Sequence, residues 1–312
     1  MYGSLLFVFS NFGERVEIEN TGLMKCSLVA VVGMTNAGKS TLINKLVGFK
    51  TSIVTNKVHT TRVKMNSVLN EGNVQLVFTD TPGIFSPKTK LEKFIVKNAW
   101  MSMKGADMVV LVLDAKRRIC VHVEKIIKRL QRDNVASIAV INKMDLLDEG
   151  ELAIFAERVQ LLHKFDRVFT VSSLYGTGVR DLIDYLQESA CDGPWLYPEE
   201  YRTDATLEFF AAEITREKLY LALRQELPYS LSVVTEQIEE KGDSIIIKQV
   251  IYVMKESQKT IVVGADAALI KSVSTSARYE LSAMLNKKVH LYLFVKVRKF
   301  WQDHLEECVG YS

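Results

Sequence analysis

Short apolar runs alternate with amphipathic stretches through the first 190 residues of the chain. Continuous apolar runs at 28–32, 108–114 and 137–141 are typical of strands buried on both faces of a parallel sheet. Stretches with helical spacing follow such runs, as expected for helices covering both faces of the sheet. We therefore expect an α/β fold over residues 25–190. The other expected strands are 63–69, 74–79 and 168–171, and the expected helices are 40–46, 91–103, 121–130, 151–163 and 179–186.

One pair of these strands is joined by a tight turn. Glu71-Gly72-Asn73 lies between the runs 63–69 and 74–79. So short a connection allows only an antiparallel hairpin. The sheet should therefore be mainly parallel, with one antiparallel strand.

The pattern changes after residue 190. Residues 191–206 contain Asp-Gly-Pro, Tyr-Pro and several charges, which favours a linker. Residues 207–300 then alternate differently and predict a small α+β domain, with 301–312 as a tail. Its expected helices are 207–223 and 268–285, and its expected strands are 231–239, 244–254 and 290–297.

The N-terminal residues 1–24 fit neither domain. The apolar run 5–9 is short and no basic residue precedes it, which argues against a signal peptide. We expect a loose, disordered extension. A contact with a membrane surface or a partner is the alternative.

Composition excludes several classes of protein but does not identify the function. The 312 residues suffice for about two domains, and the net charge of +3 is too small to indicate nucleic-acid binding without a local patch. The four cysteines form no C-x-x-C pair, which favours a reducing compartment over a disulfide framework or a zinc site. No run approaches the ~18 apolar residues that span a bilayer.

The stretch from Gly33 to Ser40 reads G-x-x-x-x-G-K-S, the phosphate-binding P-loop pattern, between an expected strand and an expected helix. The glycines let backbone N–H groups turn toward a phosphate, and the helix start adds partial positive charge. Lys39 can reach the outer phosphates and the Ser40 hydroxyl can ligate Mg²⁺. A simple glycine-rich turn is the alternative. The phosphate-binding residues are Gly33, Met34, Thr35, Asn36, Ala37, Gly38, Lys39, Ser40 and Thr41.

Two further loops follow strands at the same edge of the expected sheet, where ligands of open α/β sheets bind. Asp80, forty residues after Ser40, can hold Mg²⁺ through water, and the Gly83 N–H can meet a terminal phosphate. Alone, this second loop could be a strand-end turn.

Asn142-Lys143-Met144-Asp145 is the sharper signal. A carboxylate at Asp145 can accept from guanine N1–H and N2–H₂, and adenine has no donor at those positions, so the loop predicts selection of guanine. Asn142 can tie this loop to the phosphate loop, and the Lys143 stem can lie on the base. A lysine-bearing turn capped by Asp145 is the alternative.

Together these residues resemble a GTPase of the Ras-like translation-factor class. P-loop, Thr61, D-T-P-G, N-K-M-D and Ser172-Ser173-Leu174 occur in the order of that family. The resemblance implies that Thr61, or less readily Thr60, ligates Mg²⁺ and senses the γ-phosphate, and that the N–H groups of Ser172 and Ser173 approach the guanine oxygen. Ser173 stands where the family usually has alanine. The nucleotide set is completed by Thr81, Pro82, Ile84 and Met144, with catalytic roles for Lys39, Thr61 and Gly83, and metal roles for Ser40, Thr61 and Asp80.

Ile84 bears on the rate of hydrolysis. In Ras and Gα a glutamine follows the D-x-x-G glycine and orients the attacking water. Isoleucine cannot do so, and no arginine finger stands out in the sequence. We expect slow intrinsic hydrolysis that a partner or a monovalent ion raises. GTP should order 51–62 and 80–93, and hydrolysis should release them.

The second domain resembles the KH domain of Era-type GTPases. The matching stretches are Ala212–Lys218, Glu226–Ser230, Val289–Leu291 and Val295–Val297, and with the first domain the resemblance covers residues 25–312. It implies a cytoplasmic GTP hydrolase that uses Mg²⁺, binds the 3′ end of small-subunit ribosomal RNA and assists 30S maturation. It also implies some peripheral association with the inner face of the membrane. We expect a monomer.

The RNA-clamping loop departs from the family pattern. A KH domain clamps the RNA backbone with a G-x-x-G loop, whereas this chain has Gly264-Ala265-Asp266-Ala267. The second glycine and the usual basic residue are missing, and Asp266 repels phosphate. Lys259 and Lys271 flank the loop, and we expect Lys287, Lys288, Lys296, Arg298 and Lys299 to supply positive charge nearby. We expect weaker, salt-sensitive RNA binding that involves Lys259, Gly264, Ala265, Asp266, Ala267, Lys271, Lys287 and Lys288.

Alternatives stay open at this end of the chain. The charges from Lys287 to Lys299 could be a solvated face, and we expect Phe300-Trp301 to pack in the domain rather than stack on bases. A KH fold without RNA binding would make the chain a GTP-dependent switch that docks a protein or a membrane. A P-loop ATPase or kinase is disfavoured by Asn142-Lys143-Met144-Asp145.

Overall fold

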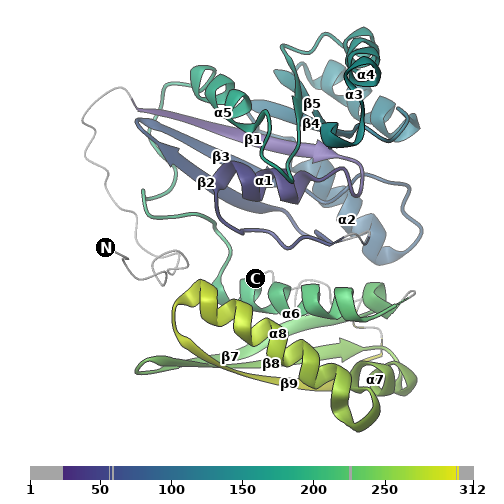
Figure 1. Cartoon of the computed structure of the whole chain (residues 1–312), viewed down its shortest axis with the longest axis vertical. Helices are drawn as coiled ribbons and strands as arrows, with labels where there is room; N and C mark the ends of the chain where they lie inside the picture. Colours follow the sequence, from purple (N-terminus) through teal and green to yellow (C-terminus); the bar gives the residue numbers. More distant parts are fainter. Residues whose placement is uncertain (1–23, 56, 58–59, 225–226, 300, 302–312) are drawn as a thin grey trace. The chain divides into compact units, whose positions relative to one another are not determined.

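The computed structural model describes residues 24–55, 57, 60–224, 227–299 and 301, and the chain divides into two units between Asp204 and Ala205. The first unit is built on a six-stranded sheet in the order β2-β3-β1-β4-β5-β6 (Figure 1). Neighbouring strands are parallel except β2, which pairs antiparallel with β3. The predicted parallel sheet and its hairpin are confirmed. The strands are β1 (Lys25–Gly33), β2 (Met65–Glu71), β3 (Val74–Asp80), β4 (Met108–Asp114), β5 (Ser137–Asn142) and β6 (Val168–Val171).

Five helices of the described residues cover the two faces of this sheet: α1 (Lys39–Val47), α2 (Lys90–Met101), α3 (Val121–Asp133), α4 (Glu149–Leu162) and α5 (Val179–Glu188). The pleat of β1 separates two cores, because alternate side chains point to opposite faces. Val29 and Val31 lie in one cluster with α1 and α5, whereas Ala30 and Val32 lie in another with α2, α3 and α4.

Local signals set where several of these helices begin and end. Thr89 and Glu92 form a reciprocal capping box at the start of α2, and Asp148 and Glu151 form another at the start of α4. Asn134 ends α3 in the left-handed conformation.

The second unit packs helices on one face of a three-stranded sheet in the order β7-β8-β9. Strands β7 and β8 are antiparallel, and β9 runs parallel to β8. This is the predicted small α+β domain. The elements are α6 (Leu207–Ala222), β7 (Ser232–Lys241), β8 (Ser244–Val253), α7 (Glu256–Val263), α8 (Ala268–Leu285) and β9 (Lys288–Val297).

Two details differ from or refine the sequence-based expectation for the second unit. Helix α7 was not predicted, because Val262 is its one fully buried side chain and its sequence carries little apolar periodicity. Trp301 is buried and its Nε1 donates to the Ser230 carbonyl oxygen at 3.0 Å, so it packs in this unit rather than in a free tail. Phe300, like residues 1–23, lies outside the described residues.

Residues 191–204 are not a free linker. Val68 N donates to the Arg202 carbonyl oxygen at 2.8 Å, and Cys26 N donates to the Cys191 carbonyl oxygen at 2.9 Å. The side chain of Gln75 accepts from the N–H groups of Leu196 and Tyr197 at 2.8 and 3.0 Å. The sequence pattern missed this because the segment attaches through backbone and polar contacts rather than an apolar stripe.

No helix among the described residues combines the length and the apolar character that crossing a bilayer requires.

Candidate functional site

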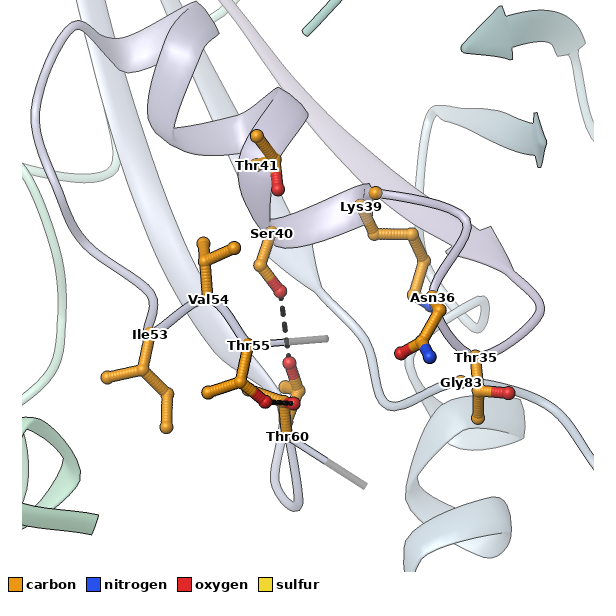
Figure 2. Close-up of a pocket in the computed structure, with 12 residues that line it drawn as sticks. Thr35, Asn36, Lys39, Ser40, Thr41, Ile53, Val54, Thr55, Thr60 and Gly83 are labelled. Carbon is orange, nitrogen blue, oxygen red and sulfur yellow. Dashed lines mark hydrogen bonds between the residues drawn. The ribbon is translucent and has the colours of Figure 1, made fainter. Parts of the chain in front are cut away.

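The phosphate loop joins β1 to α1, and Gly38 is its tightest point. Gly38 caps α1 with φ 92°, and a Cβ there would fall 2.2 Å from Asn142 Nδ2. Both the left-handed backbone and the close approach therefore require glycine. The pocket of Figure 2 opens beside this loop, and it is lined by Thr35, Asn36, Gly38, Lys39, Ser40, Thr41, Ile53, Val54, Thr55, Thr60, Thr61 and Gly83. Ile53, Val54 and Thr55 were not predicted, because no local pattern distinguishes them.

Lys39 is held within its own loop. Its Nζ donates to the carbonyl oxygens of Gly33 and Met34 at 3.3 and 3.0 Å, and its side chain runs toward Asn36 in Figure 2. Burial lowers the pKa of Lys39 to about 8, although the charge of Asp80 opposes the change. An ammonium group desolvated in this way favours an anionic partner such as phosphate.

Ser40, Thr61 and Asp80 form one hydrogen-bonded cluster. The Ser40 hydroxyl donates to Asp80 Oδ2 at 2.7 Å and lies 3.0 Å from Thr61 Oγ1, which is itself 3.4 Å from Asp80 Oδ2. Asp80 Oδ1 is buried without a hydrogen-bond partner among the described residues. Burial raises the pKa of Asp80, and the bond from Ser40 is the largest effect opposing this. Two hydroxyls and one carboxylate are hard oxygen donors that suit Mg²⁺ alongside phosphate.

Thr60 faces a different direction from Thr61. Its Oγ1 donates to the Lys57 carbonyl oxygen at 2.7 Å and lies 2.7 Å from Thr55 Oγ1, a contact drawn in Figure 2. Thr60 thus lines the pocket while its hydroxyl bonds within the preceding loop. The geometry favours Thr61 over Thr60 as the threonine that joins Ser40 and Asp80.

In the loop Asp80–Gly83, Gly83 lines the pocket and the three residues before it are buried. A Cβ on Gly83 would lie 2.7 Å from Thr35 N, so this glycine allows the loop to approach the phosphate loop closely. Thr81 donates to the Val31 carbonyl oxygen at 2.7 Å and is fully buried, and Pro82 is buried as well. Ile84 is buried, and its N–H donates to the Gly33 carbonyl oxygen at 3.0 Å. Thr81 and Ile84 therefore shape the loop from inside.

Asn142 connects the expected base loop to the phosphate loop. Its Nδ2 donates to the Ala37 carbonyl oxygen at 2.9 Å, and its Oδ1 accepts from Ser173 N and Ser173 Oγ at 3.0 and 2.8 Å. Three loops that are distant in sequence thus meet at one buried amide.

Lys143 is fixed by a residue that the sequence interpretation missed. Its Nζ donates to Asp114 Oδ2 at 2.7 Å and to the Asn36 carbonyl oxygen at 2.9 Å. Arg117 Nη1 also reaches the phosphate loop, at the Thr35 carbonyl oxygen, 3.0 Å away. The one sequence signal was the position of Asp114 at the carboxyl end of a buried strand.

Asp145 lies exposed in a short 3₁₀ turn, Met144–Leu146, and the Ser172 hydroxyl donates to its Oδ1 at 2.5 Å. The N–H groups of Ser172 and Ser173 already donate to the Thr177 carbonyl oxygen and to Asn142 Oδ1. The structure differs here from the expectation that these two N–H groups face the guanine oxygen, because both have protein acceptors.

The loop Gly264–Ala267 in the second unit is strained. Gly264 has φ 77°, and Asp266 and Ala267 have φ values of 48° and 58°, although neither is glycine. Ala267, in place of a second glycine, caps α8 in the left-handed conformation. The Lys271 ammonium donates to the Asp266 carbonyl oxygen at 3.1 Å, so it is tied to the loop, and Lys259 is half-buried on α7.

Lys287 and Lys288 do not lie beside this loop. They follow α8, whose 18 residues span roughly 27 Å, whereas the loop precedes the same helix. Lys287 Nζ pairs with Glu240 Oε2 at 2.9 Å. The expectation that these lysines supply charge close to Gly264–Ala267 is therefore wrong, since short sequence separation across a long helix is not spatial proximity.

The fold and the meeting of these loops define the class: a P-loop GTPase unit followed by a KH-type unit. A family model described as "50S ribosome-binding GTPase" matches residues 28–143, and a KH-domain model matches residues 226–302. A GTPase Era of Ehrlichia canis (strain Jake) is 58% identical over 288 residues, which is 92% of this chain and 97% of that protein. One of Rhizobium meliloti (strain 1021) is 46% identical over 283 residues, 90% of each chain.

Solved structures agree over the same length. A crystal structure of Era in complex with MgGDPNP and nucleotides 1506–1542 of 16S ribosomal RNA is 33% identical, with a TM-score of 0.88 over 91% of this chain and 98% of that one. A variant of Aquifex aeolicus Era bound to GDP·AlF4⁻ gives the same TM-score and identity, over 91% of this chain and 99% of that one. The chain belongs to the Era family of GTPases, and it is a GTP hydrolase.

Proposed function

We propose that this chain is a GTP-driven switch that binds the 3′ end of small-subunit ribosomal RNA and assists assembly of the 30S subunit. One observation carries the switch: Thr61, from the segment between α1 and β2, already contacts both Ser40 of the phosphate loop and Asp80 of the following strand. The KH unit and the Era structure solved with 16S ribosomal RNA support RNA as the partner.

Different residues of the first unit bind different parts of GTP and its Mg²⁺ ion. The loop Gly33–Ser40 and Lys39 bind the phosphates, Gly83 N–H meets the terminal phosphate, and Asp145 selects guanine. Ser40, Thr61 and Asp80 would hold Mg²⁺, which neutralises charge on the phosphates when bound. Loss of the γ-phosphate removes the acceptor that Thr61 and Gly83 share, which would release 51–62 and 80–93.

The proposed site of action is the cytoplasm, with the chain as a monomer. Peripheral association with the inner face of the membrane is a separate proposal. It is tested by flotation of the full chain with vesicles that contain anionic lipid.

The deciding experiment compares the RNA recovered with the full chain in two nucleotide states, one with a non-hydrolysable GTP analogue and one with GDP. We expect cells expressing it to yield crosslinked fragments from the 3′ end of small-subunit RNA, and co-sedimentation with 30S particles, with a non-hydrolysable GTP analogue more than with GDP. The Lys39→Ala variant controls for nucleotide dependence. Random fragments, or the same recovery in every state, would contradict the proposal.

A second candidate has its own support. Asp266 places a negative charge in the expected RNA clamp, and Lys271 bonds to the loop rather than standing free. A KH unit that does not bind RNA would leave a GTP-dependent switch that docks a protein or a membrane. In that case nucleotide-dependent co-sedimentation or flotation would occur without crosslinked RNA.

A further inference from the structure

A hollow of about 780 Å³ lies between helices α2 and α3 in the first unit, away from the nucleotide pocket. We call it the α2–α3 groove. Seven of its eleven lining side chains are cationic, and none is acidic. Four of the cations, Lys125, Lys128, Arg129 and Arg132, come from α3.

Helical spacing explains why the cations gather there. The four α3 residues are three, four and seven positions apart, which places them on one helix face. Lys93 and Lys97 of α2 follow the same rule, and Lys104 extends the row past the end of that helix. The opposite faces of both helices share one apolar core on the sheet. Packing on the sheet therefore fixes two basic rows along one groove.

Most of this charge is not neutralised. Lys93, Lys97, Lys104, Lys125 and Lys128 form no ion pair with a carboxylate anywhere in the described part of the chain. Arg129 and Arg132 both pair with Asp133, at the end of α3. Unpaired like charges along a concave surface raise a local positive potential that attracts polyanions.

Apolar side chains line the groove together with the cations. Trp100 and Met101 line the groove, and Met101 is 53% exposed. A purely solvated charged face gives no reason to expose a large apolar side chain among its cations. An aromatic ring between cations is the combination that binds single-stranded nucleic acid, where bases stack and phosphates pair.

We propose that the α2–α3 groove is a second RNA-binding surface, which holds the phosphate backbone between its lysines with a base against Trp100. This extends the proposed function, on which it rests, from the KH unit to the GTPase unit. A chain-like polyanion reaches both walls of a concave groove, whereas a flat lipid surface meets only the rims. An acidic peptide would use the cations but would leave the Trp100 ring without a base to stack on.

RNA bound in the α2–α3 groove would also affect the nucleotide switch. Helix α2 begins seven residues after Gly83, so RNA in the groove would touch the helix that follows the γ-phosphate-sensing loop. Affinity for RNA in the groove should then depend on whether GTP or GDP is bound, because both act on one connected segment.

The test compares two full-length double variants that each remove two positive charges. Lys97→Gln with Lys128→Gln changes both walls of the groove. Arg158→Gln with Lys164→Gln changes two exposed cations on and just after α4, outside the groove. The probes are the 3′-terminal small-subunit RNA alone and the same RNA extended by its adjoining upstream sequence. Affinity is measured at several salt concentrations, and GTP affinity is measured to verify the fold.

We expect the groove variant to bind the extended RNA about tenfold more weakly, with a salt slope smaller by roughly two, because each phosphate contact contributes close to one. The short RNA should bind both variants alike. Ultraviolet crosslinking should place the extended RNA on the peptide that contains Trp100, and Trp100→Leu should remove that crosslink while GTP affinity is unchanged.

Other outcomes overturn the proposal in distinguishable ways. If the groove variant matches the control on the extended RNA while the short RNA still binds, the groove is not an RNA site and the proposed function stands. If neither RNA binds the unmodified protein, both fail. If the groove variant loses only its binding to phosphatidylglycerol-containing vesicles, the groove is a lipid-binding face.

Discussion

Asn142 shows how one buried amide can hold a nucleotide site together. Its donor and acceptor atoms bond to Ala37 of the phosphate loop and to Ser173 of the last loop. The sequence predicted the tie to the phosphate loop, because the residue type and its place after a strand are local properties. Asp114 and Arg117 were not predicted, because their roles depend on contacts with residues distant in sequence. Asp114 accepts from Lys143, 29 residues away, and Arg117 donates to Thr35, 82 residues away.

Asp145 is expected to set the choice of base. Replacing it by asparagine puts an amide group opposite guanine N1–H and N2–H₂, and an NH₂ cannot accept a hydrogen bond. Losing charged hydrogen bonds worth about 1.5–3 kcal/mol should weaken GTP binding roughly 10- to 100-fold. Xanthosine triphosphate, with an oxygen at the second position, should bind better than before. Competition of GTP, XTP and ATP against a fluorescent guanine nucleotide measures the change.

Ser172→Ala is the matched control for Asp145→Asn. It removes the hydroxyl that donates to Asp145 Oδ1 but leaves the carboxylate in place. It should weaken GTP binding without altering the order of the three nucleotides. An unchanged preference for GTP over XTP in Asp145→Asn would refute the assigned role.

Lys39 should make GTP binding depend on pH above neutrality. Burial lowers the pKa of Lys39 in the nucleotide-free protein to about 8, so the ammonium loses its proton as pH rises through that value. The triphosphate favours the charged form, so binding above pH 8 must take up a proton. Affinity should fall by up to about tenfold for each further pH unit.

Calorimetric titration of the protein with GTP in buffers of different ionisation heat measures that proton directly. Uptake should be near zero at pH 7 and should approach one proton at pH 9. The Lys143→Arg variant excludes the other lysine of the site as the source. Equal affinity and no uptake across this range would show that Lys39 keeps its ordinary pKa.

At the scale of elements, the strand β2 is bonded to the segment 191–204. Asp204 Oδ1 and Oδ2 accept from Asn66 N and Asn66 Nδ2, both at 2.9 Å, and Thr203 Oγ1 donates to the Asn66 carbonyl oxygen at 2.9 Å. Asn66 lies five residues after Thr61. The chain that leads to the KH unit is thus attached to the strand that follows Thr61, the threonine proposed to bind Mg²⁺.

Asp204→Ala should loosen that attachment. The Asn66 N–H loses its acceptor, which costs about 1–3 kcal/mol when the donor is left unpaired. Hydrogen exchange of the peptide that covers residues 64–71 should accelerate roughly 5- to 150-fold, since every 1.4 kcal/mol is about tenfold. Glu200→Ala, an exposed carboxylate of the same segment, is the control and should change exchange little. Unaltered protection in Asp204→Ala would mean that the bonds to Asn66 do not hold the segment.

The loop between α7 and α8 offers a gain-of-function prediction. Replacing Ala265-Asp266-Ala267 by Lys-Lys-Gly removes one negative charge and adds two positive ones, and glycine relieves the φ of 58° at Ala267. RNA binding should tighten by roughly tenfold with a steeper salt dependence. Filter binding with the 3′-terminal small-subunit RNA measures it. Ala267→Gly alone separates relief of strain from charge, and equal affinity in all three proteins would remove this loop from the RNA site.

The elements themselves were largely predictable, and the exceptions have physical causes. Buried strands such as β4 and β5 are predictable from their continuous apolar residues, because both faces of these strands are covered. Helix α7 has no such pattern, since only one of its side chains is fully buried. The placement of Lys287 and Lys288 failed because they are near the loop in sequence but separated from it by α8, whose 18 residues span roughly 27 Å.

At the scale of the whole molecule, two units divided after Asp204 combine a nucleotide switch with a KH fold. The order of the sequence motifs along the chain was enough to predict this combination of domains. The basic α2–α3 groove was not, because its charges come from two helices whose adjacency only the packed sheet reveals. The net charge of the whole chain, +3, gives no indication that seven cations line one groove.

Hydrolysis should depend on something that the isolated chain does not supply. Ile84 is 2% exposed and bonded through its N–H to Gly33, so it cannot orient water, and the Arg117 guanidinium bonds to the Thr35 carbonyl oxygen. We expect single-turnover hydrolysis by the purified chain at roughly 10⁻⁴–10⁻² per second, the range of GTPases without an activator. Potassium in place of sodium, or added 30S particles, should raise it. Lys39→Ala identifies contaminating activity, because it should abolish turnover by this protein. A rate of tens per second from the chain alone would show that a catalytic group within it performs the part that Ile84 cannot.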